Sequence, residues 1–191
     1  MLQLVLVRHG QTEWSREGRH TGRTDVPLTE EGAREAERVR ADLDGRTFAR
    51  VLSSPLSRAL ETARLAGLGD RVETRDELLE WDYGEYEGIT TAGIRETRPD
   101  WVLWRDGCPG GEGPEDVGAR ADRMLAELEP TDGDVAVFAH GHMLRVLTAR
   151  WLELSAAEGA RFVLATATIS VLGWEHDWRA IRTWNARSGS A

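Results

Sequence analysis

The hydrophobic positions of the chain follow two alternating patterns. Short runs of consecutive apolar residues are typical of strands buried on both faces of a sheet. Between these runs lie amphipathic stretches, the clearest of which carries its apolar residues on one face at helical spacing: Ala33, Ala36, Val39 and Leu43. We therefore expect strands at residues 2–7, 50–53, 135–139, 168–174 and 178–184, and helices that begin after Thr29, Pro55, Pro114 and Gly141.

This alternation of strands and helices predicts an α/β fold. We expect one three-layer α/β/α domain with a mainly parallel central sheet flanked by helices. The helix over residues 143–152 is apolar on most faces, so it should be covered on several sides. A short turn near residues 173–177 should join the last two strands as a hairpin at the sheet edge. The domain should span residues 1–185, with the small polar tail 186–191 disordered.

The composition is that of an acidic globular protein. The chain has 191 residues and a formal net charge of −9, which argues against nucleic acid and anionic membranes as partners. No apolar run reaches membrane-spanning length, and the N-terminal run lacks the preceding basic residues of a signal peptide. The single cysteine, Cys108, excludes an internal disulfide framework and favours a reducing compartment, so we expect a cytoplasmic protein.

Arginine supplies all the basic side chains other than histidine. Lys and Arg together number 24, and none of them is lysine. Schiff-base catalysis and a phosphate-binding P-loop both need lysine and are therefore excluded. Arginine presents a planar fork of donors that suits phosphate. Arginines at strand ends and helix starts are thus the candidates for ligand binding.

Two predicted strands are followed at once by histidine. Arg8-His9-Gly10 ends the first apolar run, and His140-Gly141-His142 follows the run at 135–139. In open α/β sheets, ligands bind beyond the carboxyl ends of the strands. If the two strands are neighbours, the two rings meet over one pocket, and Arg8 suits a phosphate there. A metal site at His140 and His142 is an alternative, although no third ligand is evident nearby in the sequence.

A second arginine site follows the strand at 50–53. Ser54 and Pro55 have the residue types of a helix N-cap and of a first helical position, which places Arg58 in the first turn. A cation there opposes the helix dipole. Beside Arg8 it is better explained as one side of an anion clamp that also uses the backbone N–H groups.

One carboxylate lies in a hydrophobic setting. Glu80 follows two leucines and precedes Trp81. Burial of a carboxyl favours its neutral form, which makes it a proton donor. Glu77 and Asp82 are competing carboxylates, and composition alone does not choose among the three.

Together these segments resemble the histidine phosphatase superfamily, in its phosphoglycerate mutase-like branch. The resemblance implies the fold of that branch for the domain 1–185. It runs from residue 1 to about residue 150 in the order typical of the family, and the motifs are jointly specific. It is carried by Arg8-His9-Gly10-Gln11-Thr12-Glu13-Trp14, Thr21-Gly22, Asp25-Val26-Pro27-Leu28-Thr29, Ser53-Ser54-Pro55-Leu56-Ser57-Arg58-Ala59, Thr62-Ala63, Glu80 with Tyr83-Gly84 and Glu87-Gly88, and His140-Gly141-His142.

The resemblance implies a role for each matching residue. His9 is the nucleophile that becomes phosphorylated, and Glu80 protonates the leaving alkoxide. The transferred phosphoryl group is surrounded by Arg8, Arg58 and His140. A neutral His9 attacks, so its other ring nitrogen should donate a hydrogen bond that fixes the tautomer. For this chain we expect no cofactor and no metal. The residues expected to contact the substrate are Ser15, Thr21, Gly22, Tyr83, Gly141 and His142.

The length of the chain segment between Glu80 and His140 bears on the class of reaction. Cofactor-dependent mutases of the family carry a long basic insertion before the second histidine, whereas the interval from Glu80 to His140 is short here. We therefore favour a metal-independent phosphatase that hydrolyses small phosphomonoesters such as sugar phosphates. The resemblance is closest to small acid phosphatase and sugar-bisphosphatase members. A 2,3-bisphosphoglycerate-dependent phosphoglycerate mutase and a non-catalytic binding module stay as alternatives.

The sequence constrains specificity and partners less. Ser15 stands where the mutases usually have asparagine, and Gly113 stands where many relatives have serine. His20 and Arg145 are further candidates for the pocket wall. The expected partner is a small phosphorylated metabolite, and a homodimer through an edge strand or a tryptophan-rich patch stays open. An acidic pH optimum follows if Glu80 must carry a proton in the first step.

Overall fold

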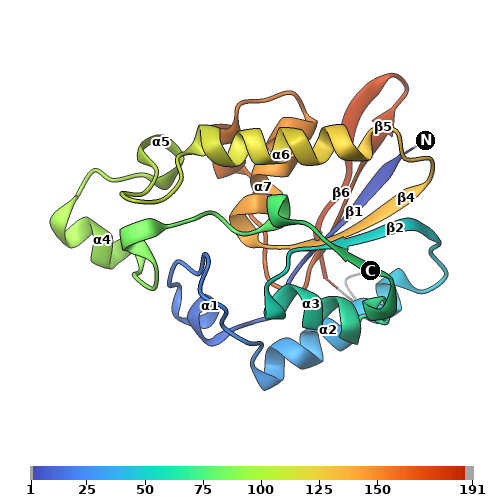
Figure 1. Cartoon of the computed structure of the whole chain (residues 1–191), viewed down its shortest axis with the longest axis horizontal. Helices are drawn as coiled ribbons and strands as arrows, with labels where there is room; N and C mark the ends of the chain where they lie inside the picture. Colours follow the sequence, from blue (N-terminus) through green and yellow to red (C-terminus); the bar gives the residue numbers. More distant parts are fainter. Residues whose placement is uncertain (1, 188–191) are drawn as a thin grey trace.

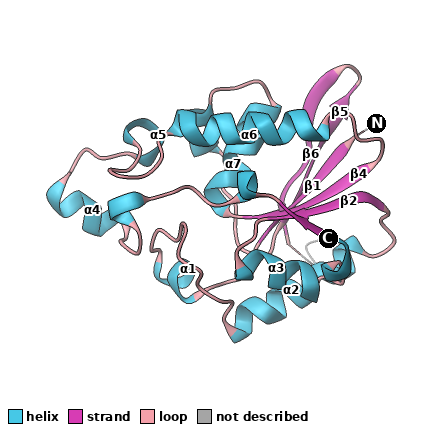
Figure 2. Cartoon of the chain, in the orientation of Figure 1, coloured by secondary structure: helices cyan, strands magenta, loops and turns pink. Residues whose placement is uncertain are grey.

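A six-stranded sheet forms the middle layer of the molecule. A computed structural model describes residues 2–187, and Figures 1 and 2 show its strands fanned out between helices. The strands are β1 (Gln3–Arg8), β2 (Phe48–Ser53), β3 (Val72–Thr74), β4 (Asp134–Ala139), β5 (Ile169–Glu175) and β6 (Trp178–Ala186). Their order across the sheet is β3-β2-β4-β1-β5-β6.

The sheet is mixed, with a parallel part and an antiparallel edge. The pairs β1–β4, β2–β4 and β2–β3 are parallel. Strands β5 and β6 pair antiparallel with each other, and β5 pairs antiparallel with β1. The predicted edge hairpin is therefore confirmed. Strand β3 was not predicted, because it has only 3 residues and Val72 alone among them is apolar.

Four helices cover the two faces of the sheet. Helices α2 (Glu30–Leu43) and α3 (Ser57–Leu65) lie on one face, and α6 (Pro114–Leu128) and α7 (Gly141–Trp151) lie on the other (Figure 1). This confirms the predicted α/β/α layers. The shorter helices are α1 (Glu13–Glu17), α4 (Thr91–Thr97), α5 (Leu103–Asp106), and the 3₁₀-helices η1 (Gly69–Arg71), η2 (Asp76–Leu78), η3 (Gly84–Tyr86) and η4 (Ala156–Arg161).

Strict alternation along the central strands creates two hydrophobic cores. In β1, Leu4 and Leu6 belong to the core under α6 and α7, whereas Val5 and Val7 belong to the core under α2 and α3. Because successive strand residues point to opposite faces, a strand covered on both sides must be apolar throughout. The continuous apolar runs of the sequence are explained in this way.

The start of α3 differs from the prediction. The helix begins at Ser57 rather than directly after Pro55, and Ser54 is not its cap. The Ser57 N–H and hydroxyl both donate to Asp25 Oδ1, at 2.9 and 2.8 Å. The first turn is thus capped by a carboxylate from a distant loop, which no local pattern indicates. Arg58 still lies in the first turn, as predicted.

The segment between β3 and α6 is the least regular part of the molecule. Figure 1 shows that α4 and α5 stand out beyond the carboxyl ends of the strands. Within residues 2–187, no helix is both long and apolar enough to cross a bilayer. Ala186, the first residue of the predicted tail, is the last residue of β6. Residues 188–191 of that tail lie outside the described part of the chain.

Candidate active site

The carboxyl ends of three parallel strands meet at one edge of the sheet. Arg8 is in register with Ala139, and Ser53 is in register with Phe138. The pairing of β1 with β4 continues one residue beyond β1, because His9 N–H donates to the Ala139 carbonyl at 3.0 Å. The rings of His9 and His140 consequently lie 5.2 Å apart between centroids. The structure brings the two predicted histidines together, as adjacent strands require.

His9 is held as a neutral imidazole with one free nitrogen. Its Nδ1 lies 2.7 Å from the Gly10 carbonyl, and a carbonyl can only accept, so Nδ1 carries the proton. The Nε2 atom therefore has a lone pair. Burial lowers the pKa of His9 well below its ordinary value, and the Arg58 and Arg8 guanidiniums lower it further. The predicted tautomer-fixing hydrogen bond is present.

Arg8 has a donor available to an anion. Its Nη1 donates to the Leu164 carbonyl at 2.5 Å, while its buried Nε has no hydrogen-bond partner within residues 2–187. Buried donors are rarely left unpaired. A Cβ added at Gly141 would lie 3.3 Å from Arg8 Nε. The absence of a side chain at Gly141 thus leaves the guanidinium in place.

Arg58 and His140 lie beneath the floor of the site. Both side chains are fully buried. Arg58 Nε donates to His140 Nδ1 at 3.2 Å, and His140 Nε2 lies 2.7 Å from Ser54 Oγ. Because arginine cannot accept, His140 Nδ1 is unprotonated and Nε2 carries the proton. Burial, followed by the Arg58 charge, lowers the pKa of His140 well below its ordinary value.

The remaining donors of Arg58 hold a loop. Nη2 donates to the carbonyls of Thr21 and Gly22, at 3.2 and 2.8 Å, and Nη1 donates to the Thr24 carbonyl at 2.9 Å. A Cβ at Gly22 would lie 2.5 Å from the Trp81 carbonyl. Gly22 therefore permits close packing of this loop and does not line the cavity, in contrast to its predicted place among the substrate contacts.

Glu80 sits at the N-terminus of α7. Its Oε1 accepts from the backbone N–H groups of Trp81 and Met143, at 2.9 and 2.8 Å, and its Oε2 accepts from His142 N–H at 3.0 Å. A carboxylate is favourable at this end of a helix. Glu80 lines the histidine cavity, whereas Glu77 and Asp82 do not. The structure thereby distinguishes the three carboxylates that the sequence left equivalent.

These side chains surround a small polar cavity of about 270 Å³. Of the predicted substrate contacts, Ser15, Thr21, Tyr83, Gly141 and His142 line it. Four lining residues were not predicted from the sequence: Gly18, Arg19, Thr91 and Leu164. They lie outside every motif, and only Arg19 has a motif next to it. The complete lining is Arg8, His9, Ser15, Gly18, Arg19, His20, Thr21, Glu80, Tyr83, Thr91, Gly141, His142, Arg145 and Leu164.

One wall of this cavity is made of uncharged rings. Burial lowers the pKa of His20 to about 4 and lowers the pKa of His142 well below its ordinary value, with Arg145 adding to the effect. Tyr83 Oη lies 2.6 Å from His142 Nδ1, and Thr91 Oγ1 lies 3.2 Å from His20 Nε2. Near neutral pH, this wall offers hydrogen bonds rather than charge.

Arg145 supplies a cation at the rim of the same wall. Its guanidinium lies 4.5 Å above the Trp104 ring and donates through Nε to the Gly159 carbonyl at 3.0 Å. These contacts hold the guanidinium between Trp104 and η4, and Arg145 is one of the residues that line the cavity. Arg8 at the floor and Arg145 at the rim thus both contribute positive charge to the cavity.

The metal alternative finds little support in the described residues. Within residues 2–187, no group of three or more His, Cys, Asp or Glu side chains is arranged to hold a metal ion. His140 already uses both ring nitrogens, on Arg58 and Ser54. The His140-Gly141-His142 motif therefore lacks a third ligand in the part of the chain that the structure describes.

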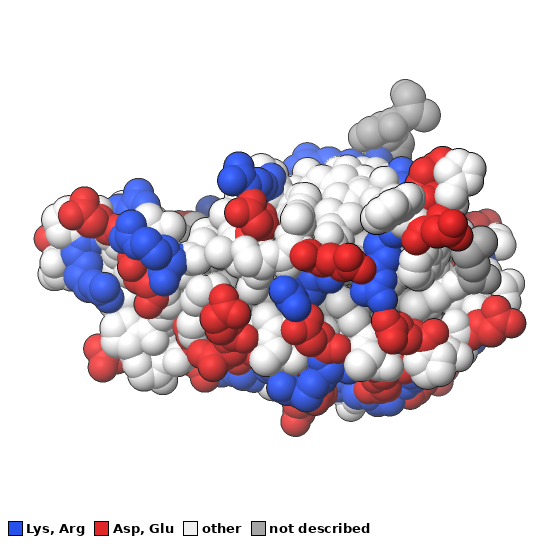
Figure 3. All heavy atoms as spheres, turned by 90° about the horizontal axis from the view of Figure 1, so that it is seen from above, with Lys and Arg blue, Asp and Glu red and all other residues white. Residues whose placement is uncertain are grey.

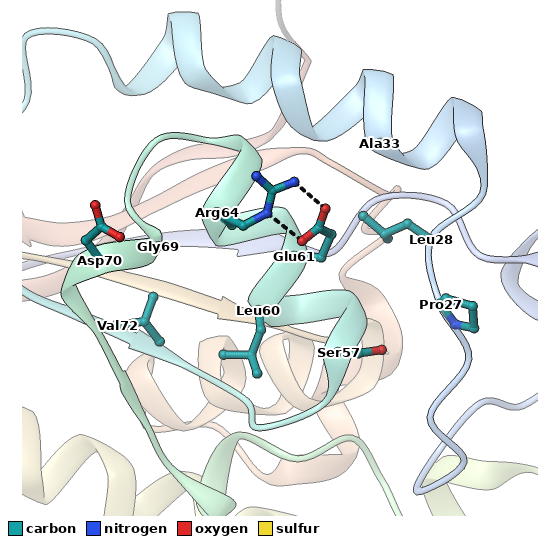
Figure 4. A pocket seen from close by; sticks show the side chains of 10 residues that line it. All are labelled: Pro27, Leu28, Ala33, Ser57, Leu60, Glu61, Arg64, Gly69, Asp70 and Val72. Atoms are coloured by element: carbon teal, nitrogen blue, oxygen red, sulfur yellow. Dashed lines mark hydrogen bonds and ion pairs between the residues drawn. The ribbon is translucent and has the colours of Figure 1, made fainter.

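A larger cavity lies elsewhere. It has a volume of about 710 Å³ and is bordered by α2, α3 and β3 (Figure 4). Leu28, Leu60 and Val72 line it, and the ion pair between Arg64 and Glu61 lies beside it. None of its lining residues is a histidine. Size alone would therefore have pointed away from the cluster of candidate catalytic groups.

The fold and the paired histidines define a class, and comparison with known proteins gives the same one. The family model of the histidine phosphatase superfamily (branch 1) matches residues 4–187. The chain belongs to this family. A solved structure of an open reading frame product from Mycobacterium tuberculosis superposes with a TM-score of 0.90 at 43% identity, covering 97% of this chain and 98% of that chain.

Particular relatives include both phosphatases and mutases. An acid phosphatase of Mycobacterium tuberculosis is 45% identical over 94% of this chain and 90% of that protein. The sedoheptulose 1,7-bisphosphatase of Saccharomyces cerevisiae is 38% identical over 78% of this chain and 67% of that protein. A 2,3-bisphosphoglycerate-dependent phosphoglycerate mutase of Mesorhizobium japonicum is 38% identical over 75% of this chain and 78% of that protein.

Proposed function

We propose that the protein is a metal-independent phosphatase that hydrolyses small phosphomonoesters through a phosphohistidine on His9. The observation that carries this proposal is the state of the His9 ring. It is buried, neutral and fixed by Gly10 with Nε2 unprotonated, next to the unpartnered Nε of Arg8. A nucleophile and an anion-binding donor are thus in place before any substrate arrives.

In the first step, His9 Nε2 attacks phosphorus and the bond to the leaving oxygen breaks. Charge on the phosphoryl oxygens is neutralised by Arg8 and, from below, by Arg58. Glu80 gives its proton to the leaving alkoxide. Its Oε1 accepts two backbone N–H groups and its Oε2 accepts one, so Oε2 is the oxygen that has a position left for that proton.

In the second step, water attacks the phosphohistidine. Glu80 is now a carboxylate and takes a proton from the water, while the bond between phosphorus and Nε2 breaks and His9 returns to its neutral form. Phosphorus undergoes two in-line displacements. The configuration at phosphorus is therefore retained.

The cavity suits a small, hydroxylated metabolite. Its volume of about 270 Å³ and its wall of uncharged His20, His142 and Tyr83 offer hydrogen bonds to hydroxyl groups. The name of the sedoheptulose 1,7-bisphosphatase relative fits this class of substrate. On the face seen in Figure 3, acidic and basic side chains are interspersed without a broad basic field, which favours a metabolite over a polyanion. The lone Cys108 supports a cytoplasmic location.

The test is hydrolysis of p-nitrophenyl phosphate and a panel of sugar phosphates by the purified protein in EDTA. We expect turnover that chelation does not reduce. His9→Ala should lower kcat/KM by about 1,000-fold or more, and His176→Ala is the matched control, because this side chain is 88% exposed. No turnover by the natural sequence, turnover lost on chelation, or full activity in His9→Ala would overturn the proposal.

A mutase is the second candidate, because a phosphoglycerate mutase is among the relatives. It would return the phosphoryl group of His9 to a substrate hydroxyl instead of to water. Incubation with 3-phosphoglycerate and 2,3-bisphosphoglycerate separates the two functions. We expect release of inorganic phosphate from the phosphatase panel and no build-up of 2-phosphoglycerate.

A further inference from the structure

Arg120 is a buried arginine that no part of the proposed reaction uses. It comes from the middle of α6, and 8% of its surface is exposed. Its guanidinium faces the chain segment that ends at Glu80. It donates to five oxygen atoms: Glu112 Oε1 at 2.7 Å, Glu112 Oε2 at 2.8 Å, and the carbonyls of Glu77 at 2.8 Å, Leu79 at 2.8 Å and Glu80 at 3.3 Å.

Glu112, its ion-pair partner, holds the other side of Glu80. The Glu112 Oε2 atom accepts from Asp82 N–H at 2.8 Å, and the Glu112 carbonyl accepts from Trp81 Nε1 at 2.8 Å. The Glu112 N–H donates to the Asp82 carbonyl at 2.9 Å. The pair thus fixes the Leu79 and Glu80 carbonyls on one side and the backbone of Asp82 on the other.

The same arginine also reaches the helix that receives the Glu80 carboxylate. Arg120 Nη1 lies 3.5 Å from Met143 Sδ, and Met143 N–H donates to Glu80 Oε1 at 2.8 Å. Residues 79–83 belong to no helix or strand, so no regular ladder fixes this backbone. Hydrogen bonds from other segments must hold it, and Arg120 and Glu112 supply such bonds on both sides of Glu80.

We propose that Arg120 and Glu112 are positioning residues that fix Glu80 as the proton donor. This inference rests on the proposed phosphatase function. Arginine is required because its planar fork reaches a carboxylate and several carbonyls at once, whereas the lysine ammonium is a single point of charge. The pair touches neither the phosphate nor the nucleophile, because neither residue lines the histidine cavity.

A positioning role for Glu80 has a specific kinetic consequence. Protonation by a general acid matters most when the leaving oxygen is strongly basic. An alkyl phosphate such as a sugar phosphate needs the Glu80 proton, whereas p-nitrophenyl phosphate has a weakly basic leaving group and needs it little. Displacement of Glu80 should therefore lower kcat/KM selectively for the alkyl phosphate.

The experiment compares kcat/KM for these two substrates in Arg120→Lys, Arg120→Met and Glu112→Gln. Glu80→Gln sets the scale, with a selective loss on the order of 100-fold on the alkyl phosphate. We expect the positioning variants to show a selective loss of about tenfold or more, since displacement by about 1 Å has effects of this size or larger. Arg120→Lys should lose less kcat/KM on the alkyl phosphate than Arg120→Met, because it keeps the charge beside Glu112.

Arg75→Met is the matched control. Arg75 also pairs with a carboxylate of α6, Glu127, at 2.9 Å, but its guanidinium donates to Glu127, Glu73 and the Thr74 carbonyl rather than to residues 79–83. The ratio of the two rates is unaffected by the fraction of folded protein, so a poorly folding variant does not obscure the result. An equal loss on both substrates, or an unchanged ratio, would overturn this inference. Absence of turnover by the natural sequence would instead refute the phosphatase function itself.

Discussion

At the scale of single residues, the site depends on burial that keeps its histidines uncharged. Burial is the largest cause of the lowered pKa of His9, His20, His140 and His142. A neutral His9 is a nucleophile, whereas a protonated one is not. The neighbouring guanidiniums contribute in the same direction at His9 and His140. The guanidiniums that we propose as the phosphate-binding groups thus also keep the proposed nucleophile neutral.

This burial makes the stability of the fold depend on pH. The folded pKa of each of these histidines lies below its ordinary value of 6.5, so below that pH the unfolded chain binds more protons. The stabilisation is complete above about pH 6.5 and is lost as the pH falls, by at most about 1.4 kcal/mol per pH unit for each histidine. Thermal unfolding followed by circular dichroism should show the melting temperature fall between about pH 7 and about pH 5. A melting temperature that is flat or rises over this range would contradict the account.

Activity should respond to pH differently. Because the pKa of His9 is lowered well below its ordinary value, His9 stays neutral to lower pH than an ordinary histidine does, and Glu80 must be protonated for the first step. We expect kcat/KM for sugar phosphates to be highest on the acidic side, measured over short times at a temperature where the fold is intact. A rate that rises steadily from about pH 5 to about pH 9 would be incompatible with this assignment.

Gly141 gives a steric test of the anion site. A Cβ there would lie 3.3 Å from both Cζ and Nε of Arg8, and the guanidinium would have to move. We expect Gly141→Ala to lower kcat/KM by about tenfold or more, with little loss of stability because alanine favours the helix. Wild-type activity in Gly141→Ala would show that the Arg8 position is unimportant.

At the scale of elements, the ends of strands and helices carry the chemistry. The strand ends could be predicted, because β1 and β4 contain continuous apolar runs that end directly before Arg8-His9 and His140. The role of Ser54 could not be predicted, because its hydroxyl contacts His140 Nε2 and the two residues follow different strands. The same holds for Thr91 and Leu164, which reach the cavity only through the folding of long connections. Local patterns locate elements, whereas contacts between elements decide which side chains line the site.

The cap of α3 shows the energetic side of such a contact. Asp25 Oδ1 accepts from both the N–H and the hydroxyl of Ser57. Asp25→Ala should lower the free energy of unfolding by about 1 kcal/mol, whereas Asp25→Asn, which keeps an acceptor, should lose less. Because the loop also binds Arg58 through Thr24, we expect KM to rise in the alanine variant. Urea unfolding and steady-state kinetics measure the two effects, and equal stability of both variants would argue against the cap.

At the scale of the whole molecule, a chain with a net negative charge carries a site lined with arginine. The net charge is −9, yet Arg8, Arg19 and Arg145 all line one small cavity. The three-layer fold allows this combination, because α/β alternation exposes one edge of the sheet where strand ends converge. The fold class could be predicted from that alternation alone. The depth of the site could not, since Arg58 and His140 proved to lie under the cavity floor.

The central claim is that His9 takes the phosphoryl group, and trapping that intermediate tests it most directly. Glu80→Gln should slow the attack of water more than the first step with p-nitrophenyl phosphate, so phosphoenzyme should accumulate. After an alkaline quench and digestion, mass spectrometry should find the phosphate on His9, and none when His9→Ala is added. Phosphate on another residue, or steady turnover without any phosphohistidine, would contradict the account.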